Sequence, residues 1–287
     1  MAKLKGVWLP VITPFFENNI DYVSYKALIN HYNSKGITGL IPNGTTGECP
    51  TIEDAEFEEL LEKTLEFNNN RLPIYYGLGG NNTHKILKQL KVVEKYKVEG
   101  ILSVSPYYSR PDQHGIFEHF KAISESTDLK IIIYNIPYRT GRNIENDTLF
   151  KLAELDNIVG VKDSCGNINQ TMDLIFNRPD NFSVLTGEDN LFYLNLVLGG
   201  DGGILAASHL ETEKFVSVLE SVEKNDWQTA LKTWKSIEPF IPLLFKEPNP
   251  APIKYFLWKK GLIKSPELRL PLTGISENLK QELNKYL

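Results

Sequence analysis

Short apolar runs alternate with longer amphipathic segments along this chain, and this alternation predicts strands that are each followed by a helix. Eight of the runs have strand length, and several are rich in β-branched residues, which favour strands. The expected strands are 7–12, 40–42, 74–77, 101–105, 131–135, 159–162, 184–186 and 203–205.

The segment after Thr51 illustrates the helical spacing between these runs, because a set of its residues falls on one face of a helix. The members of this set are Phe57, Leu60, Leu61, Thr64 and Leu65. Thr51 with Asp54 is expected to cap this helix at its start. Asp21 and Gly36 are expected to start and stop the helix before it.

Eight strand and helix pairs within about 220 residues predict a parallel (β/α)8 barrel of the α/β class. The alternative is a doubly wound open sheet, and the absence of a GxGxxG turn after the first strand favours the barrel. Strand signals stop after Glu211, and the rest of the chain has helical spacing that is interrupted by the proline-rich stretch 247–252. We therefore expect a barrel over 1–222 and a C-terminal helical extension of the same domain over 223–287.

Composition and charge narrow the possible partners and the compartment. The 287 residues carry a formal net charge of −5 without a dense basic stripe, which argues against nucleic acid or a membrane surface as a partner. Pro10 and Pro14 interrupt the apolar stretch 6–16, so it is expected to form a strand and not a secretory signal. Cys49 and Cys165 form no CxxC pair, and we expect a reduced, cytoplasmic setting.

Lys162 stands at the end of the apolar strand run 158–162, where side-chain alternation places it on the same face as Ile158 and Gly160. The ordinary explanation is a lysine that reaches water at a strand end. The chemical explanation is a buried amine whose charged form is disfavoured, which makes it a nucleophile for a carbonyl carbon.

Polar groups follow three other expected strands, at the end where barrel enzymes place their working residues. The turn 43–48 reads Asn-Gly-Thr-Thr-Gly-Glu, and its successive backbone amides could bind a small anion such as a carboxylate. Tyr107 and Tyr108 follow the fourth strand. Tyr134 ends the fifth, where its parity predicts a phenol near Lys162, and Arg139 follows it.

These groups form a set that suits a 2-keto acid. The lysine would condense with the keto group, the Tyr and Thr hydroxyls would move protons, and the turn would hold the carboxylate. The five histidines (His31, His84, His114, His119 and His209) lack metal-ligand spacing, so no metal site is expected.

On these motifs the chain resembles the dihydrodipicolinate synthase and N-acetylneuraminate lyase superfamily of pyruvate-dependent class I aldolases. The motifs are Gly44-Thr45-Thr46-Gly47-Glu48, Pro106-Tyr107-Tyr108, Tyr134-Asn135-Ile136-Pro137 and Gly160-Val161-Lys162. The resemblance implies that Lys162 forms a covalent imine with pyruvate and that no cofactor is used. It also implies proton transfer by Tyr134, a hydroxyl relay through Thr45 and Tyr108, and a pocket lined by Gly187 and Ile204.

The resemblance also implies how the substrates are held. The amides of Thr45 and Thr46 would bind the pyruvate carboxylate, and Tyr107 would reach across a subunit interface of a homo-oligomer, expected to be a tetramer. Arg139 matches the arginine with which the synthase branch binds the carboxylate of L-aspartate 4-semialdehyde. The tail motifs 249–254 and 268–272 also resemble the synthase branch.

The leading hypothesis is therefore a synthase that condenses pyruvate with this aldehyde to 4-hydroxy-tetrahydrodipicolinate in lysine biosynthesis. The alternative is a lyase for N-acetylneuraminate or a 2-keto-3-deoxy sugar acid, since Asp163 stands where synthases usually carry Glu. A more distant alternative is a non-catalytic metabolite-binding barrel.

The resemblance finally bears on regulation by the end product. Lysine-sensitive synthases bind L-lysine at a dimer interface, and Asn81 and Tyr107 match their pattern. Asp54, Phe57 and Lys85 depart from it, because the sensitive enzymes carry two histidines and a glutamate there. Insensitivity to lysine is expected.

Overall fold

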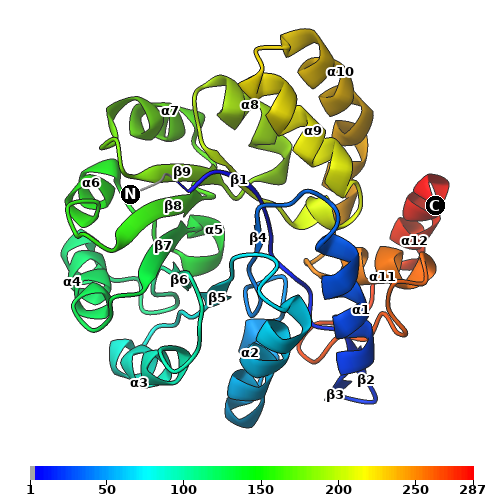
Figure 1. Ribbon diagram of the computed structural model, residues 1–287, viewed down its shortest axis with the longest axis horizontal. Helices are drawn as coiled ribbons and strands as arrows, with labels where there is room; N and C mark the ends of the chain where they lie inside the picture. Colours follow the sequence, from blue (N-terminus) through cyan, green and yellow to red (C-terminus); the bar gives the residue numbers. More distant parts are fainter. Residues whose placement is uncertain (1–3) are drawn as a thin grey trace. The chain divides into compact units, whose positions relative to one another are not determined.

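The computed structural model describes residues 4–287, and Figure 1 shows how strands and helices alternate along them. Eight parallel strands follow the order β4-β1-β10-β9-β8-β7-β6-β5. They are β1 (Gly6–Leu9), β4 (Gly39–Leu40), β5 (Tyr75–Gly77), β6 (Gly100–Val104), β7 (Lys130–Asn135), β8 (Ile158–Asp163), β9 (Ser183–Thr186) and β10 (Gly202–Ile204). Each overlaps an expected strand, and the predicted (β/α)8 fold class is confirmed.

Helical segments follow every one of these strands. The α-helices are α1 (Tyr22–Tyr32), α2 (Asp54–Asn68), α3 (Thr83–Val93), α4 (Gln113–Ser124), α5 (Pro137–Thr140), α6 (Asn146–Leu152), α7 (Ile168–Asn177), α8 (Phe192–Val197), α9 (Thr212–Glu223), α10 (Trp227–Ile237), α11 (Ala251–Lys259) and α12 (Glu277–Leu283). The 3-10 segments are η1 (Cys49–Thr51), η2 (Asp189–Leu191), η3 (Ala206–His209), η4 (Glu238–Leu244) and η5 (Asn284–Tyr286).

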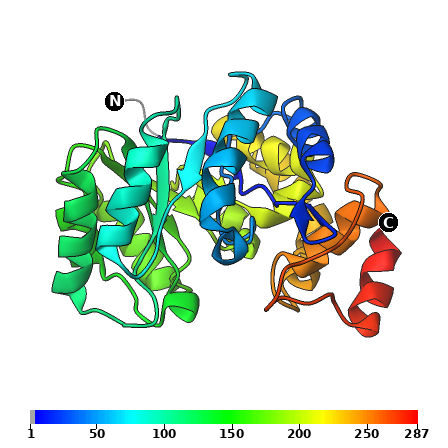
Figure 2. The same cartoon turned by 90° about the horizontal axis from the view of Figure 1, so that it is seen from below.

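The chain divides into two compact units, and the first comprises the segment ending at Gly6 together with Ile74–Ile204. It contains β5 to β10, with helices α3, α4, α6 and α7 outside the strands in both views (Figures 1 and 2). Strand β7 shows why these elements form: its isoleucines 131–133 are fully buried, as expected for a parallel strand that is covered on both faces.

The second unit comprises Val7–Pro73 and Leu205–Leu287. In it β1 pairs with β4, and helices α1, α2 and α9 to α12 accompany them. A short hairpin of β2 (Phe15–Phe16) and β3 (Asn19–Ile20), not expected from the sequence, is bridged to Glu267 of the C-terminal tail. The tail is helical, as predicted, and the break at the proline-rich stretch is shorter than expected, because α11 already begins at Ala251 within 247–252.

Two expected helix boundaries were wrong and one was right. Asp21 caps α1 by accepting from the amides of Val23 and Ser24. That helix ends at Tyr32, before Gly36, although Gly36 does adopt the positive φ of 78° that favours glycine. Helix α2 begins at Asp54 with Glu53 as its cap, and Thr51 instead donates to the Glu48 carbonyl. Glu53 forms a reciprocal capping box with Glu56, which satisfies two amides.

Candidate active site

Lys162 is the penultimate residue of β8, and its side chain is only 6% exposed. The register of β7 and β8 sets Tyr134 directly beside it. The Lys162 Nζ lies 4.2 Å from the centroid of the Tyr134 ring. The prediction that this phenol lies near this amine is therefore confirmed, and the amine is not extended into water.

Burial lowers the pKa of Lys162 to about 8, because an ammonium is poorly solvated at this position. The negative charges of Asp189 and Glu188 act in the opposite direction, and the positive charge of Arg139 lowers the pKa further. With a pKa of about 8, roughly a tenth of the side chain is a neutral amine at pH 7. The residue is thus prepared to attack a carbonyl carbon.

Tyr134 is equally buried, and burial raises the pKa of its phenol far above the usual range. The hydroxyl therefore keeps its proton at neutral pH and can act as a donor or as a relay. The positive charge of Arg139 and the hydroxyl of Ser164 oppose this rise of the pKa. A protonated phenol beside a neutral amine suits proton transfer during imine chemistry.

Gly187 follows β9 and allows Lys162 to occupy this position. A Cβ added to Gly187 would lie 2.6 Å from the Lys162 Cε and 2.3 Å from the Ser164 Oγ, which is closer than carbon contacts allow. Ile204 ends β10, next to β9, and is fully buried. Both residues, expected to line the pocket, belong to the same unit as Lys162.

Arg139 lies on the short helix α5, where its guanidinium stands 5.5 Å from the ring of Tyr138. Its charge lowers the pKa values of Lys162, Tyr134 and Glu188, so one cation influences all three groups. The sequence reading did not single out Glu188 and Asp189. Their signal was available, because two acidic residues follow the seventh expected strand after one glycine, Gly187.

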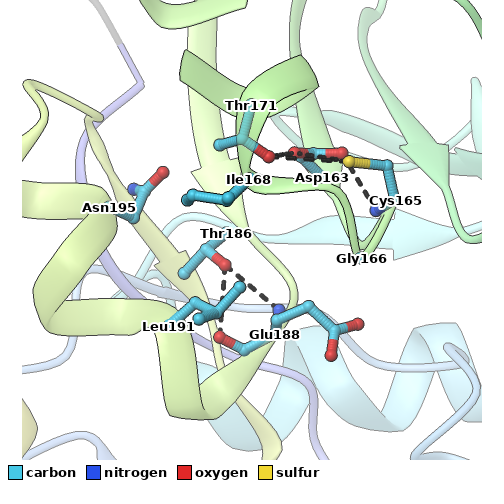
Figure 3. Close-up of a pocket in the computed structure, with 9 residues that line it drawn as sticks. All are labelled: Asp163, Cys165, Gly166, Ile168, Thr171, Thr186, Glu188, Leu191 and Asn195. Atoms are coloured by element: carbon cyan, nitrogen blue, oxygen red, sulfur yellow. Dashed lines mark hydrogen bonds between the residues drawn. The ribbon is translucent and has the colours of Figure 1, made fainter.

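Asp163 points to the other side of β8 and lines a small pocket with eight other residues (Figure 3). Its carboxylate accepts from the Thr171 hydroxyl at 2.6 Å and from the Cys165 amide at 3.1 Å. Burial raises its pKa. Asp163, which stands where synthases usually carry Glu, therefore holds the turn after Lys162 through these two hydrogen bonds.

The turn with Thr45 and Thr46 belongs to the second unit. The amides of Gly47, Glu48 and Cys49 donate to carbonyls within the turn. Across residues 4–287, the amides of Thr45 and Thr46 donate no hydrogen bond to any protein group. Two adjacent donors without acceptors suit a bound carboxylate.

Tyr107 and Tyr108 follow β6 and are 40% and 91% exposed. Tyr108 adopts a φ of +70°, which is rare outside glycine. The structure thus brings together Lys162, Tyr134, Arg139, Gly187 and Ser164 within one unit. It does not pack Tyr108 against its own chain.

Residues 4–287 lack two features of other protein classes. No helix there is long and apolar enough to cross a membrane. In the same residues, no three His, Cys, Asp or Glu side chains are grouped so that they could hold a metal ion.

Comparison with known proteins places this geometry in context. The model of the dihydrodipicolinate synthetase family matches residues 3–287. The chain is 61% identical over 285 residues to 4-hydroxy-tetrahydrodipicolinate synthase 2 of Clostridium acetobutylicum, covering 99% of this chain and 100% of that protein. The structure of 4-hydroxy-tetrahydrodipicolinate synthase from Methylacidiphilum fumariolicum SolV matches with a TM-score of 0.96 at 36% identity, covering 99% and 94% of the two chains. A structure described as the first monomeric dihydrodipicolinate synthase variant matches with a TM-score of 0.95 at 36% identity, covering 98% and 95%.

Proposed function

The chain belongs to the dihydrodipicolinate synthetase family, and we propose that it condenses pyruvate with L-aspartate 4-semialdehyde to 4-hydroxy-tetrahydrodipicolinate. The family match and the 61% identity to a synthase over the whole chain favour this reaction over cleavage of sugar acids and over a non-catalytic role. The observation that carries the chemistry is the buried Lys162, whose pKa is lowered to about 8 beside the phenol of Tyr134.

In the proposed mechanism the neutral amine of Lys162 attacks the keto carbon of pyruvate, and the keto oxygen leaves as water after two proton transfers. Tyr134 supplies and removes these protons, with Thr45 and Tyr108 completing a hydroxyl relay. Loss of a methyl proton turns the imine into an enamine. Its terminal carbon attacks the aldehyde carbon, and the aldehyde oxygen takes up a proton. The amino group of the aldehyde substrate then attacks the imine carbon and displaces the Lys162 nitrogen, which closes the ring and frees the lysine. The proposal needs no metal or organic cofactor.

Substrate binding divides between two sets of groups in this proposal. The free amides of Thr45 and Thr46 hold the pyruvate carboxylate, and Gly187 and Ile204 line the pocket around the imine. Arg139 holds the carboxylate of the aldehyde, because a guanidinium pairs well with that planar anion.

Arg139→Ala is expected to reduce the specificity constant for aspartate semialdehyde and to leave imine formation with pyruvate nearly unchanged. Removing a charged hydrogen-bonding partner costs roughly 2–4 kcal/mol of transition-state binding, which is about 30-fold to 1000-fold. Initial rates with each substrate varied in turn measure the effect, and Arg142→Ala, at an exposed arginine just after α5, is the control. Equal losses for both substrates would mean that Arg139 has a structural role.

We further propose that the protein is a homo-oligomer, as expected of a tetramer-forming family. The name of the monomeric variant implies that dihydrodipicolinate synthases are usually oligomeric. From the sequence, Tyr107 was expected to reach the neighbouring subunit. The far greater exposure of Tyr108 makes Tyr108 the better candidate for that contact, in which case each subunit's relay would use the Tyr108 of its neighbour. Sedimentation of the native protein at micromolar concentration measures the oligomeric state.

L-Lysine is not expected to inhibit the enzyme. Lys85 is exposed at the start of α3, where lysine-sensitive enzymes carry a glutamate, so an ammonium would face the ligand's own amine. A like charge at about 4 Å costs on the order of 1–4 kcal/mol. Titration of L-lysine into the assay checks this, and half-inhibition below about 1 mM, which corresponds to roughly −4 kcal/mol, would contradict it.

The proposed function as a whole is tested by a product assay. Pyruvate is incubated with aspartate semialdehyde and, separately, with N-acetylmannosamine and glyceraldehyde, and each matching aldol product is also supplied for cleavage. Preferred turnover of aspartate semialdehyde supports the synthase. Preference for a neutral sugar aldehyde would overturn it.

A further inference from the structure

The C-terminal segment from Asn249 to Arg269 contacts the turn that carries Thr45 and Thr46, although about 200 residues of sequence separate them. The Asn249 Nδ2 donates to the Thr46 Oγ1 at 3.0 Å. Both side chains are buried, with 8% and 3% exposure. The sequence marks the tail motif 249–254 only by its resemblance to the synthase branch. This contact shows what one residue of the motif, Asn249, does in the structure.

The contact determines what the Thr46 hydroxyl can do. Its oxygen accepts from Asn249, so its own proton must be donated elsewhere. Within residues 4–287 that proton has no acceptor, since the hydrogen bond from Asn249 is the single one that the hydroxyl makes. A buried hydroxyl without an acceptor is costly and indicates that a ligand oxygen takes its proton.

The rest of the turn is fixed from the same segment. Glu48 is 1% exposed, adopts a positive φ of 56°, and forms an ion pair with the fully buried Lys254. Lys254 also donates to the Glu267 carbonyl at 2.9 Å, and the Arg269 amide donates to Glu48 at 3.2 Å. These contacts hold the turn two residues beyond Thr46. The orientation of the hydroxyl is therefore set by neighbours that are themselves held in place.

On the other side, Thr13 donates from its hydroxyl to the Gly47 carbonyl at 2.8 Å. The segment Gly47–Glu48 is thus held by both the N-terminal and the C-terminal parts of the second unit. Little freedom remains for the Thr46 backbone amide, which has no acceptor of its own.

We propose that Asn249 is a positioning residue. It orients the Thr46 hydroxyl so that this group donates a hydrogen bond to the carboxylate of pyruvate. The inference rests on the proposed function. It adds to that function a third donor, the Thr46 O–H, beside the two backbone amides of Thr45 and Thr46. Asn249 itself does not touch the substrate.

Asn249→Ala is expected to raise the KM for pyruvate about 10-fold to 100-fold, because a correctly oriented hydrogen bond to a charged group is lost. The KM for aspartate semialdehyde is expected to stay within twofold and kcat to change little. Asn249→Asp should bind pyruvate more weakly still, because its carboxylate accepts the Thr46 proton and repels the substrate anion.

Thr46→Val provides the matched variant, since it removes the hydroxyl and keeps the side-chain volume. Once Thr46 is Val, Asn249→Ala should cause no further rise in the KM for pyruvate, because both changes remove the same interaction. A general loosening of the fold would instead give additive losses and would raise both KM values. Thr46→Val and Asn249→Asp keep the test decisive if Asn249→Ala does not fold.

The experiment begins with borohydride trapping of pyruvate on the unmodified protein over a range of pyruvate concentrations. Absence of any trapped adduct would overturn the proposed function and this inference with it. Normal trapping in the parent protein together with an unchanged concentration dependence in Asn249→Ala would overturn the inference alone. A shift to higher pyruvate concentration in Asn249→Ala and Thr46→Val, without addition in the double variant, would support it.

Discussion

Lys162→Ala is expected to abolish both condensation and the trapping of pyruvate by borohydride. The imine nitrogen comes from this side chain, so no neighbouring group can replace it in the proposed mechanism. Borohydride with pyruvate should inactivate the parent protein, and peptide mass spectrometry should find the adduct on Lys162. Residual turnover near the parent rate, or a label at another position, would show that the assignment is wrong.

The chain offers a demanding internal control for this experiment, because Lys254 is a second buried lysine whose pKa burial lowers to about 8. A lowered pKa alone therefore does not select the reactive amine. Lys254 forms an ion pair with Glu48 and donates to the Glu267 carbonyl, so its amine is engaged on the protein. The amine of Lys162 instead faces the ring of Tyr134, 4.2 Å from the ring centroid. Labelling should consequently be confined to Lys162.

The pH dependence of imine formation follows from the amine of Lys162. Attack needs the neutral amine, and the pKa of Lys162 is lowered to about 8. The rate of imine formation should therefore rise about tenfold per pH unit below 8 and level off above it. Tyr134→Phe should keep this profile and lower turnover by about 10²-fold, the usual effect of losing a positioned proton-transfer group.

The fold was largely predictable because each strand carries its own local signal. The run Ile131-Ile132-Ile133 combines β-branched residues with burial on both faces, and neither property depends on distant parts of the chain. The β2–β3 hairpin gave no such signal, since its strands have two residues each and one of them is bridged to Glu267 from the tail. Its formation depends on a contact that no local pattern encodes.

The candidate site likewise has one feature that could be predicted from the sequence and others that could not. The position of Lys162 beside Tyr134 follows from strand register, and parity along two neighbouring strands was enough to predict it. The influence of Glu188 and Asp189 on the pKa of Lys162 was not predicted, because acidic residues after a strand are also common on ordinary surfaces. The contact of Asn249 with Thr46 could not be found from spacing, since it joins distant segments through folding.

Lys254→Met is expected to lower the free energy of unfolding by about 3–5 kcal/mol, because it leaves the carboxylate of Glu48 buried without its partner. Methionine keeps most of the side-chain volume, so the loss reflects charge and not a cavity. Glu48→Gln should also lower the free energy of unfolding, because Glu48 raises the pKa of Lys254 and its loss leaves the Lys254 ammonium buried without its partner. Chemical denaturation of the three proteins at pH 7 measures both differences.

The double variant Lys254→Met with Glu48→Gln separates charge from packing. It removes the buried charges together and should recover most of the stability lost by Lys254→Met, since neutral replacements of a buried pair are often nearly neutral in effect. No recovery would mean that the ion pair itself, or the contact of Lys254 with the Glu267 carbonyl, supplies the stability.

The effect of pH on Lys254→Met supplies the second check. Burial raises the pKa of Glu48, and Lys254 opposes that rise, so removing Lys254 raises the pKa further. In this variant the folded state binds a proton more tightly than the unfolded state does. Its stability is therefore fully present below the unfolded pKa of Glu48 and is lost as the pH rises through the folded pKa. The stability gap to the parent protein should narrow as the pH falls from 7 towards 5, and a gap that stays constant over this range would show that Glu48 is not the source of the loss.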